Sequence, residues 1–275
     1  MHQTKNILRK NMLIFDIIKN KSMIFNLAKS DFKKRFVGSY FGIVWMFVQP
    51  LATVLVYTLI FQVGFKTVPP ISNLPYVIWL IPGIIPWFYF QDALIQGTGV
   101  LYEYNFLVKK VVFNVSMLPI VKIVSILFSH LCFLVIMFIV FLVSRTRISI
   151  SAVYIIYFTF ATTILSLGLV YFTSAINVFF KDMSQIIGIL MQFGIWMAPI
   201  MYDESLFSGK AELFTKLLKL NPIYYIVKGY RYAMVGQEFS DFKFLTIYFW
   251  VVTVLIFYLG NRTFNKLKLH FSDVL

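Results

Sequence analysis

Six runs of this sequence contain no Asp, Glu, Lys or Arg, and their lengths constrain the fold more than any other feature. They cover residues 36–65, 67–91, 123–144, 148–180, 183–202 and 244–261, which are 30, 25, 22, 33, 20 and 18 residues long. A helix needs about 20 apolar residues to cross the hydrocarbon core, and a backbone in lipid must satisfy its own hydrogen bonds. The runs predict an all-α integral membrane protein with six transmembrane helices, at about 42–65, 74–95, 120–144, 152–177, 183–202 and 244–261.

Charge predicts the orientation of the chain. An even number of crossings places both termini on one side, which then carries sixteen of the Lys and Arg residues against nine on the other. The positive-inside rule puts that side in the cytoplasm. We therefore expect a multi-pass protein of the cytoplasmic membrane, with an amino-terminal region at 1–35, a transmembrane domain at 36–265 and a tail at 262–275. Attraction to anionic membrane lipid accounts for the net charge of +14 better than nucleic-acid binding does.

Three segments outside the spans are too apolar for solvated loops. Residues 22–37 repeat apolar side chains every three or four positions, with lysines off that stripe, which predicts an amphipathic interfacial helix. Residues 101–119 predict a short cytoplasmic helix on the membrane surface that can dock a partner. Residues 203–243 predict two short helices that dip into the outer leaflet as a re-entrant pair, joined at Asn221-Pro222.

Groups that could perform chemistry are scarce. The three histidines are far apart, and His130 is expected to hydrogen-bond within the bundle. Gly209-Lys210 is the nearest approach to a phosphate-binding loop, but Glu204 stands where that motif has its first glycine. Acids are expected only at cytoplasmic span ends, at Asp92 and Asp182, which argues against proton coupling. We expect no metal and no cofactor in this chain.

Aromatic residues are unusually frequent: 31 Phe, 16 Tyr and 5 Trp in 275 residues. Lipid contact and interface belts explain many of them. Others fall within the predicted spans, and their faces suit the apolar faces of sugar rings. These are Trp45, Tyr57, Phe61, Phe193 and Trp196.

Four motifs, in this order and spacing, carry a family resemblance over about residues 27–275. They are Asp31-Phe32-Lys33 to Gly42 with Trp45 and Gln49-Pro50; Pro82-Gly83 with Pro86-Trp87; residues 107–113 with Leu118-Pro119; and residues 198–202 with Asn221-Pro222 and Arg231. The chain resembles the permease subunit of type-2 ABC exporters of polysaccharides such as O-antigen, capsule or teichoic acid. Two departures are Ala198 and Asn114, where the family often has Ser and Pro.

The resemblance implies a transporter rather than an enzyme. It implies a homodimer joined by two separate ATP-binding subunits that hold ATP and Mg, and a substrate polymer linked to undecaprenyl diphosphate. Spans one and five are the implied channel lining, which would carry the aromatic residues named above. Lys33, Lys34 and Arg35 could form a cationic entrance for the lipid diphosphate, although positive-inside anchoring explains them equally well.

The implied contacts with the ATP-binding subunit are Phe106, Lys109, Lys110, Phe113, Lys181 and Asp182. Two other functions stay open at this point. One is export of a small molecule or drug by the same kind of transporter. The other is a membrane-embedded transferase, which the lack of an acid–base or histidine constellation disfavours.

Overall fold

The computed structural model describes residues 18–71, 74–109, 113–207, 212–238 and 241–275. Within these ranges the chain is helical and contains no strand, and five helices are long and apolar enough to cross a membrane. These are Gly42–Gly64 (η2 Gly42–Val44, α4 Trp45–Tyr57 and η3 Thr58–Gly64), α5 Tyr76–Thr98, Val115–Val143 (η4 Val115–Met117 and α8 Leu118–Val143), Ile150–Phe179 (η5 Ile150–Val153 and α9 Tyr154–Phe179) and Phe242–Val274 (α13 Phe242–Leu267, η7 Lys268–His270 and α14 Phe271–Val274).

The predicted crossing at 183–202 is wrong as a single helix. The helix there, α10, covers only Met183–Gly194, and 12 residues rise about 18 Å, short of the roughly 30 Å of a hydrocarbon core. Turns and bends follow it as far as Tyr202. Irregular backbone is tolerated here because a side chain of the protein pairs with its polar groups. Arg231 donates hydrogen bonds to the carbonyl oxygens of Pro199 and Ile200.

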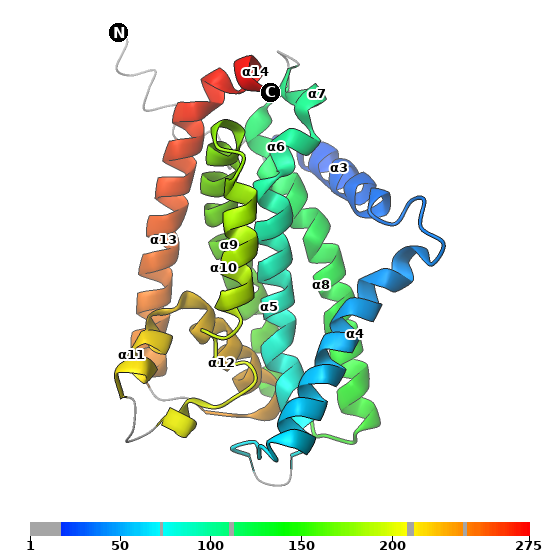
Figure 1. Ribbon diagram of the computed structural model, residues 1–275, viewed down its shortest axis with the longest axis vertical. Helices are drawn as coiled ribbons and strands as arrows, with labels where there is room; N and C mark the ends of the chain where they lie inside the picture. The colour runs from blue at the N-terminus through cyan, green and yellow to red at the C-terminus, as the bar shows by residue number, and fades with distance from the viewer. Residues whose placement is uncertain (1–17, 72–73, 110–112, 208–211, 239–240) are drawn as a thin grey trace.

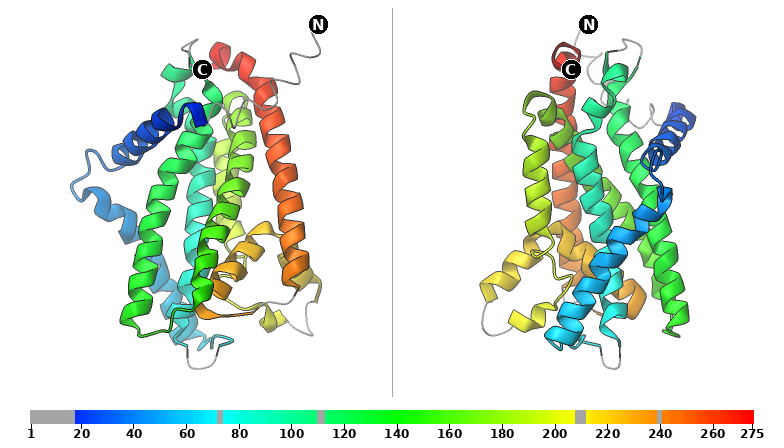
Figure 2. Two further views of the ribbon diagram at one scale, coloured as in Figure 1. Left: turned by 180° about the vertical axis from the view of Figure 1, so that it is seen from behind. Right: turned by 45° about the vertical axis from the view of Figure 1, so that its right-hand side comes forward.

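The elements separate into two ends joined by the long helices. Figures 1 and 2 show α3 (Lys21–Lys34), α6 (Val100–Glu103), α7 (Asn105–Val108) and α14 gathered at one end. The helices α11 (Glu212–Leu220) and α12 (Pro222–Val235) lie toward the opposite end, together with η6 (Glu204–Phe207). The two short helices predicted between the last spans are therefore confirmed. Asn221 joins them, and its side chain caps α12 by accepting from the backbone N–H of Ile223 at 3.0 Å.

The amphipathic helix predicted near the amino terminus is confirmed as α3. Its buried residues are Ile24, Ala28 and Asp31, and α3 packs on α8. A sharp bend then leads into the first span, where Gly38 and Gly42 adopt φ of +85° and +50°, a conformation that glycine accepts without steric cost. The sequence did not indicate the carboxylate of Asp31 within the buried face.

The helix α5 lies at the centre of the bundle. It contacts α8, α9, α10, α12 and α4. In its most apolar stretch of 18 residues, 78 % of the residues are buried. In the most apolar stretch of Gly42–Gly64 none of the residues is buried, so α4 lies against one side of the bundle and its outer face is open. Gly42–Gly64 is the more hydropathic of the two helices, so burial and not hydropathy separates the central helix from the peripheral one.

Two helices approach backbone to backbone where α9 packs on α13. A Cβ added to Gly260 would lie 2.1 Å from the carbonyl oxygen of Gly168, and one added to Gly168 would lie 2.8 Å from Cα of Phe257. Small residues permit this kind of close approach in membranes, where packing rather than water drives association.

We therefore expect Gly260→Ala to separate α9 from α13 and to lower the free energy of unfolding by about 1–3 kcal/mol, as overpacking does. The matched control is Gly188→Ala on α10, where an added Cβ meets nothing within 4 Å. Thermal unfolding in detergent, followed by size-exclusion fluorescence, would measure both. Equal melting of the two variants would contradict the close packing.

Candidate functional site

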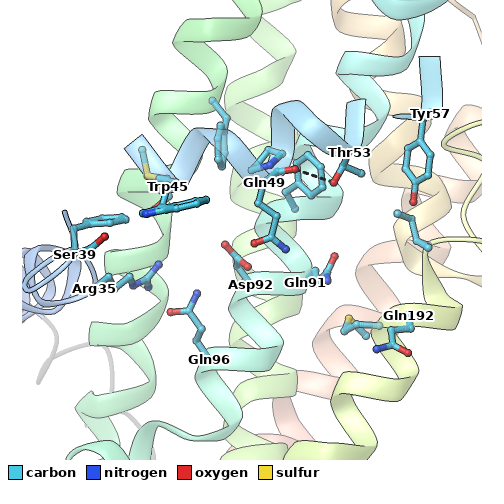
Figure 3. Close-up of a pocket in the computed structure, with 18 of the residues that line it drawn as sticks. Arg35, Ser39, Trp45, Gln49, Thr53, Tyr57, Gln91, Asp92, Gln96 and Gln192 are labelled. Carbon is cyan, nitrogen blue, oxygen red and sulfur yellow. Dashed lines mark hydrogen bonds between the residues drawn. The ribbon is translucent and has the colours of Figure 1, made fainter. Parts of the chain in front are cut away.

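A cavity of about 690 Å³ lies between α4 on one side and α5 and α10 on the other, with the end of α3 and part of α8 completing its wall. Figure 3 shows its polar side chains converging from these separate helices. The volume is within the range of about 300–1,000 Å³ that ligand sites occupy. Both apolar rings and polar groups line it.

Helical spacing brings the cavity residues of α4 into one stripe. Trp45, Gln49, Thr53 and Tyr57 recur every four positions and all line the cavity. The hydroxyl of Thr53 donates to the backbone carbonyl of Gln49 at 2.9 Å, the interaction drawn in Figure 3. That bond ties the Thr53 hydroxyl to its own helix and leaves the Gln49 amide to face across the cavity.

The facing wall comes from α5. Phe88, Gln91, Asp92 and Gln96 all line the cavity, at spacings of three, four and eight from Phe88 that keep them on one helix face. Figure 3 shows Gln49 pointing from α4 toward Gln91 and Asp92. Asp92 was expected at a cytoplasmic span end, but α5 runs on to Thr98, which leaves Asp92 about 9 Å from the end of the helix.

Three of the five predicted aromatic residues line the cavity, namely Trp45, Tyr57 and Trp196. The other two do not. Phe61 stacks on Tyr76 with ring centroids 6.1 Å apart. Phe193 is 67 % exposed on α10.

The three predicted basic residues divide between the cavity and its surroundings. Arg35 lines the cavity, contacts Asp31 at 3.8 Å and donates to Ser125 Oγ at 3.4 Å. Burial lowers the pKa of Arg35, although Asp31 opposes that effect. Lys33 is exposed, and the ammonium of Lys34 lies 5.9 Å from the ring of Tyr104. Only Arg35 is therefore brought to the cavity.

An ionic cluster joins α3 to the segment that follows α5. The Lys122 ammonium on α8 contacts Asp31 and Glu103, both at 2.7 Å, and the hydroxyl of Tyr104 donates to Asp31 at 2.6 Å. Burial by itself raises the pKa of the Asp31 carboxyl, but Lys122 and the hydrogen bonds outweigh it and hold that pKa below its usual value. The cluster connects α3, α6 and α8 through charged groups.

Most of the residues predicted to contact an ATP-binding subunit lie at this same end. Phe106 is 50 % exposed on α7, Lys109 is exposed, and Phe113 packs partly against the core. Lys181 and Asp182, in the turn between α9 and α10, are exposed. The Lys181 ammonium lies 5.8 Å from the ring of Tyr102, so the two predicted contact regions are neighbours; Lys110 lies outside the described residues.

A second polar cluster holds the irregular segment after α10. The guanidinium of Arg231 is fully buried and lies 3.5 Å from the ring centroid of Trp79. It donates to the carbonyl oxygens of Trp79, Pro199 and Ile200 at 3.4, 2.6 and 2.5 Å. A Cβ on Gly83 would lie 2.9 Å from Nη2 of Arg231, which gives this glycine of the Pro82-Gly83 motif a packing role.

Beside Arg231, the carboxylate of Asp203 accepts from three residues, Lys228, Gln237 and Ser205. Lys228 contacts Asp203 at 3.0 Å and Glu204 at 3.4 Å, and the Gln237 amide donates to Asp203 at 2.9 Å. Burial raises the pKa of Asp203, but Lys228 and the hydrogen bonds from Ser205 lower it to about 2. Asp203 therefore stays ionised at neutral pH and keeps this loop attached to α12.

No group of three His, Cys, Asp or Glu side chains that could hold a metal occurs in the part of the chain that the structure describes. His130 is buried, and its Nε2 lies 3.0 Å from the hydroxyl of Tyr230, as expected for a histidine bonded within the bundle. Cys132 is a free cysteine.

The polar wall of the cavity was not predicted from the sequence. Gln49 was noted only as part of the Gln49-Pro50 motif, and Gln91, Gln96 and Gln192 were not noted at all, because uncharged side chains do not interrupt the charge-free runs. The available signal was their position: polar side chains at helical spacing on one face of otherwise apolar spans. Such groups normally face the interior of a bundle or a cavity.

Comparison with known proteins assigns the family. The family described as ABC-2 type transporter matches residues 23–235. The chain is 24 % identical over 270 residues to the O-antigen export system permease protein RfbA of Myxococcus xanthus, covering 95 % of this chain and 98 % of the relative. It is 23 % identical over 256 residues to the protein of the same name from Klebsiella pneumoniae, covering 90 % and 93 %. The chain is a multi-pass membrane permease rather than an enzyme, and it belongs to the ABC-2 type transporter family.

Proposed function

We propose that this chain is the membrane-spanning subunit of an ATP-driven exporter that moves an undecaprenyl-diphosphate-linked polysaccharide across the cytoplasmic membrane. The observation that carries the proposal is the cavity between α4, α5 and α10, where the Trp45 and Trp196 rings lie beside amide side chains. Aromatic faces and amide groups are the two chemistries that recognise sugar rings and their hydroxyl groups. Export of O-antigen by relatives that match nearly the full chain supports the same substrate class.

The proposed topology has six crossings with both termini in the cytoplasm. The fifth crossing is α10 together with the irregular residues 195–202, which lead from one end of the bundle to η6 and α11 near the other. The excess of Lys and Arg on the terminal side supports the orientation.

The proposed assembly is a homodimer of this chain with two ATP-binding subunits, which carry the ATP and Mg. The open side of α4 supports a second copy, because the apolar window of Gly42–Gly64 is 0 % buried in the single chain. The exposed Phe106, Lys109, Lys181 and Asp182 at one end support docking of the ATP-binding subunit there. Lys33, Lys34 and Arg35 are proposed to attract the lipid diphosphate at the mouth of the cavity.

We expect the cavity aromatics to set the rate of export. Trp45→Leu and Trp196→Leu keep most of the apolar area but lose the ring face, whose stacking contributes on the order of 1 kcal/mol. Each variant should therefore slow export about fivefold while the protein still inserts. Surface polysaccharide measured at matched expression would give the rate.

The control for this prediction is an aromatic residue away from the cavity. Phe138 is unsuitable, because it is half-buried and packs against the core, whereas Phe244 on α13 is 70 % exposed. Phe244→Leu should export normally. Equal export by all three variants would show that the rings serve as ordinary membrane packing. Export of small molecules only by the wild-type protein would instead support the drug-exporter alternative.

We expect charge reversal in the docking segment to separate ATP turnover from export. Lys109→Glu combined with Lys110→Glu reverses two charges beside the exposed Phe106, and rim charges steer and orient a protein interface. Export per ATP hydrolysed by the assembled complex should fall at least tenfold, with normal insertion. Lys29→Glu, on the exposed face of α3, is the control. Unchanged export by the double variant would place the docking segment elsewhere.

A further inference from the structure

Four uncharged glutamines and one aspartate, from three helices, line the cavity. Gln49 comes from α4, Gln91, Asp92 and Gln96 from α5, and Gln192 from α10. The Gln91 amide oxygen accepts from the Trp87 indole N–H at 2.9 Å, which fixes the amide and leaves its NH₂ group to donate. Among the described residues, the side chains of Gln49, Asp92, Gln96 and Gln192 make no hydrogen bond to the protein.

Amides without partners are costly within a membrane span, because lipid offers them neither donors nor acceptors. Packing against apolar neighbours would leave that cost uncompensated. Figure 3 shows instead that Gln49 on α4 points across the cavity toward Gln91 and Asp92 on α5. The buried Ser129 hydroxyl and the Arg35 Nε, both in the cavity wall, also lack a hydrogen-bond partner within the described residues. These groups together call for a ligand rich in hydroxyl groups.

The charges of the wall oppose a different ligand, the diphosphate. Arg35 and Asp92 are the two charged residues that line the cavity, and their formal charges cancel. Arg35 also has Asp31 at 3.8 Å. A diphosphate carries more than one negative charge and would face the Asp92 carboxylate without a surplus of cations, an arrangement that like-charge repulsion disfavours.

We infer that Gln49, Gln91, Asp92 and Gln96 form the hydroxyl-binding wall of a saccharide subsite, with Trp45 as its stacking platform. Each amide offers both donors and acceptors, and the carboxylate accepts from hydroxyl groups. The subsite holds uncharged sugar units of the cargo, while the diphosphate stays at the mouth beside α3. This inference rests on the proposed export of a lipid-linked polysaccharide, and it names the residues that select the sugar.

The test measures binding to the assembled complex in nanodiscs without ATP. The first probe is the cell's own polysaccharide, released from its lipid by mild acid and fluorescently labelled; the second is undecaprenyl diphosphate without sugar. Gln49→Leu and Gln91→Leu should each weaken binding of the released polysaccharide about three- to tenfold, the effect of losing one hydrogen bond. The double variant should lose more than tenfold, and undecaprenyl diphosphate should not compete.

Gln62→Leu is the matched control, because Gln62 lies in the same span, is exposed and does not line the cavity. It should bind the released polysaccharide as wild type does. Elution as a monodisperse complex shows that each variant is folded, and Gln49→Met provides a second uncharged replacement if Gln49→Leu fails to assemble.

Two results would overturn the inference and leave the proposed function standing. One is displacement of the polysaccharide by undecaprenyl diphosphate, with binding that depends on Arg35 and not on Gln49. The other is polysaccharide binding that the glutamine variants do not change. Failure of the proposed function has a separate signature, since wild-type cells would then carry no exported polysaccharide that depends on this chain.

Discussion

Arg231→Met should leave almost no folded permease in the membrane. The substitution removes the fully buried guanidinium and with it the donors to the carbonyl oxygens of Trp79, Pro199 and Ile200. Each buried acceptor left without a donor costs about 1–3 kcal/mol, so the three together cost about 3–9 kcal/mol. A protein has only about 5–15 kcal/mol of stability. The yield of monodisperse protein in detergent, and its thermal unfolding, would measure the loss.

Two further substitutions separate hydrogen bonding from charge and packing. Arg231→Lys keeps the charge but replaces the planar fork with a single ammonium that cannot reach three carbonyls in the same geometry, so its stability should be intermediate. Gly83→Ala places a Cβ 2.9 Å from Nη2 of Arg231 and should reproduce part of the defect. Arg147→Met, at an exposed arginine, is the control. Normal folding of Arg231→Met would show that water or lipid satisfies the segment after α10.

The spans that were predicted well are those whose ends coincide with charge or turn residues. The predicted 42–65 and 74–95 correspond to Gly42–Gly64 and Tyr76–Thr98 in the structure. The prediction of one helix over 183–202 was wrong because an apolar sequence does not distinguish a helix from irregular backbone whose polar groups are hydrogen-bonded by other parts of the protein. Here the donor is Arg231, which lies 31 residues after Ile200 and 32 after Pro199. No local pattern within 183–202 indicates so distant a partner.

The outcome for the aromatic residues depends on helix geometry. In an α-helix Phe61 would continue the stripe of Trp45 and Tyr57, but residues Thr58–Gly64 form a π-helix, whose wider turn rotates the following side chains. Phe193 follows Gln192 directly, and one residue turns a helix by about 100°, which takes its ring away from the cavity. Composition and spacing identify candidate rings, whereas the local helix type decides which of them reach the cavity.

Lys122→Met should detach α3 from the bundle. The ammonium neutralises Asp31, whose side chain is 1 % exposed, at 2.7 Å. Removal of one partner of a buried ion pair costs about 3–5 kcal/mol, and Arg35, at the longer distance of 3.8 Å from Asp31, replaces little of the lost contact. Because the loss is local to α3, we expect rapid proteolysis between α3 and the first span before the rest of the bundle unfolds. Lys29→Met, on the exposed face of α3, should not change the cleavage rate.

A second change distinguishes the ion pair from general packing. Asp31→Leu combined with Lys122→Met removes both charges together, and such a replacement of a buried pair is often neutral or stabilising. The double variant should therefore recover most of the protection that Lys122→Met alone loses. Glu103 then loses its 2.7 Å contact with Lys122, so α6 is no longer tied to α3 by charge. If this folded double variant exports poorly at normal ATP turnover, the cluster transmits motion from the docking segment to α3; if the double variant is cleaved as fast as Lys122→Met, the pair does not hold α3 by its charges.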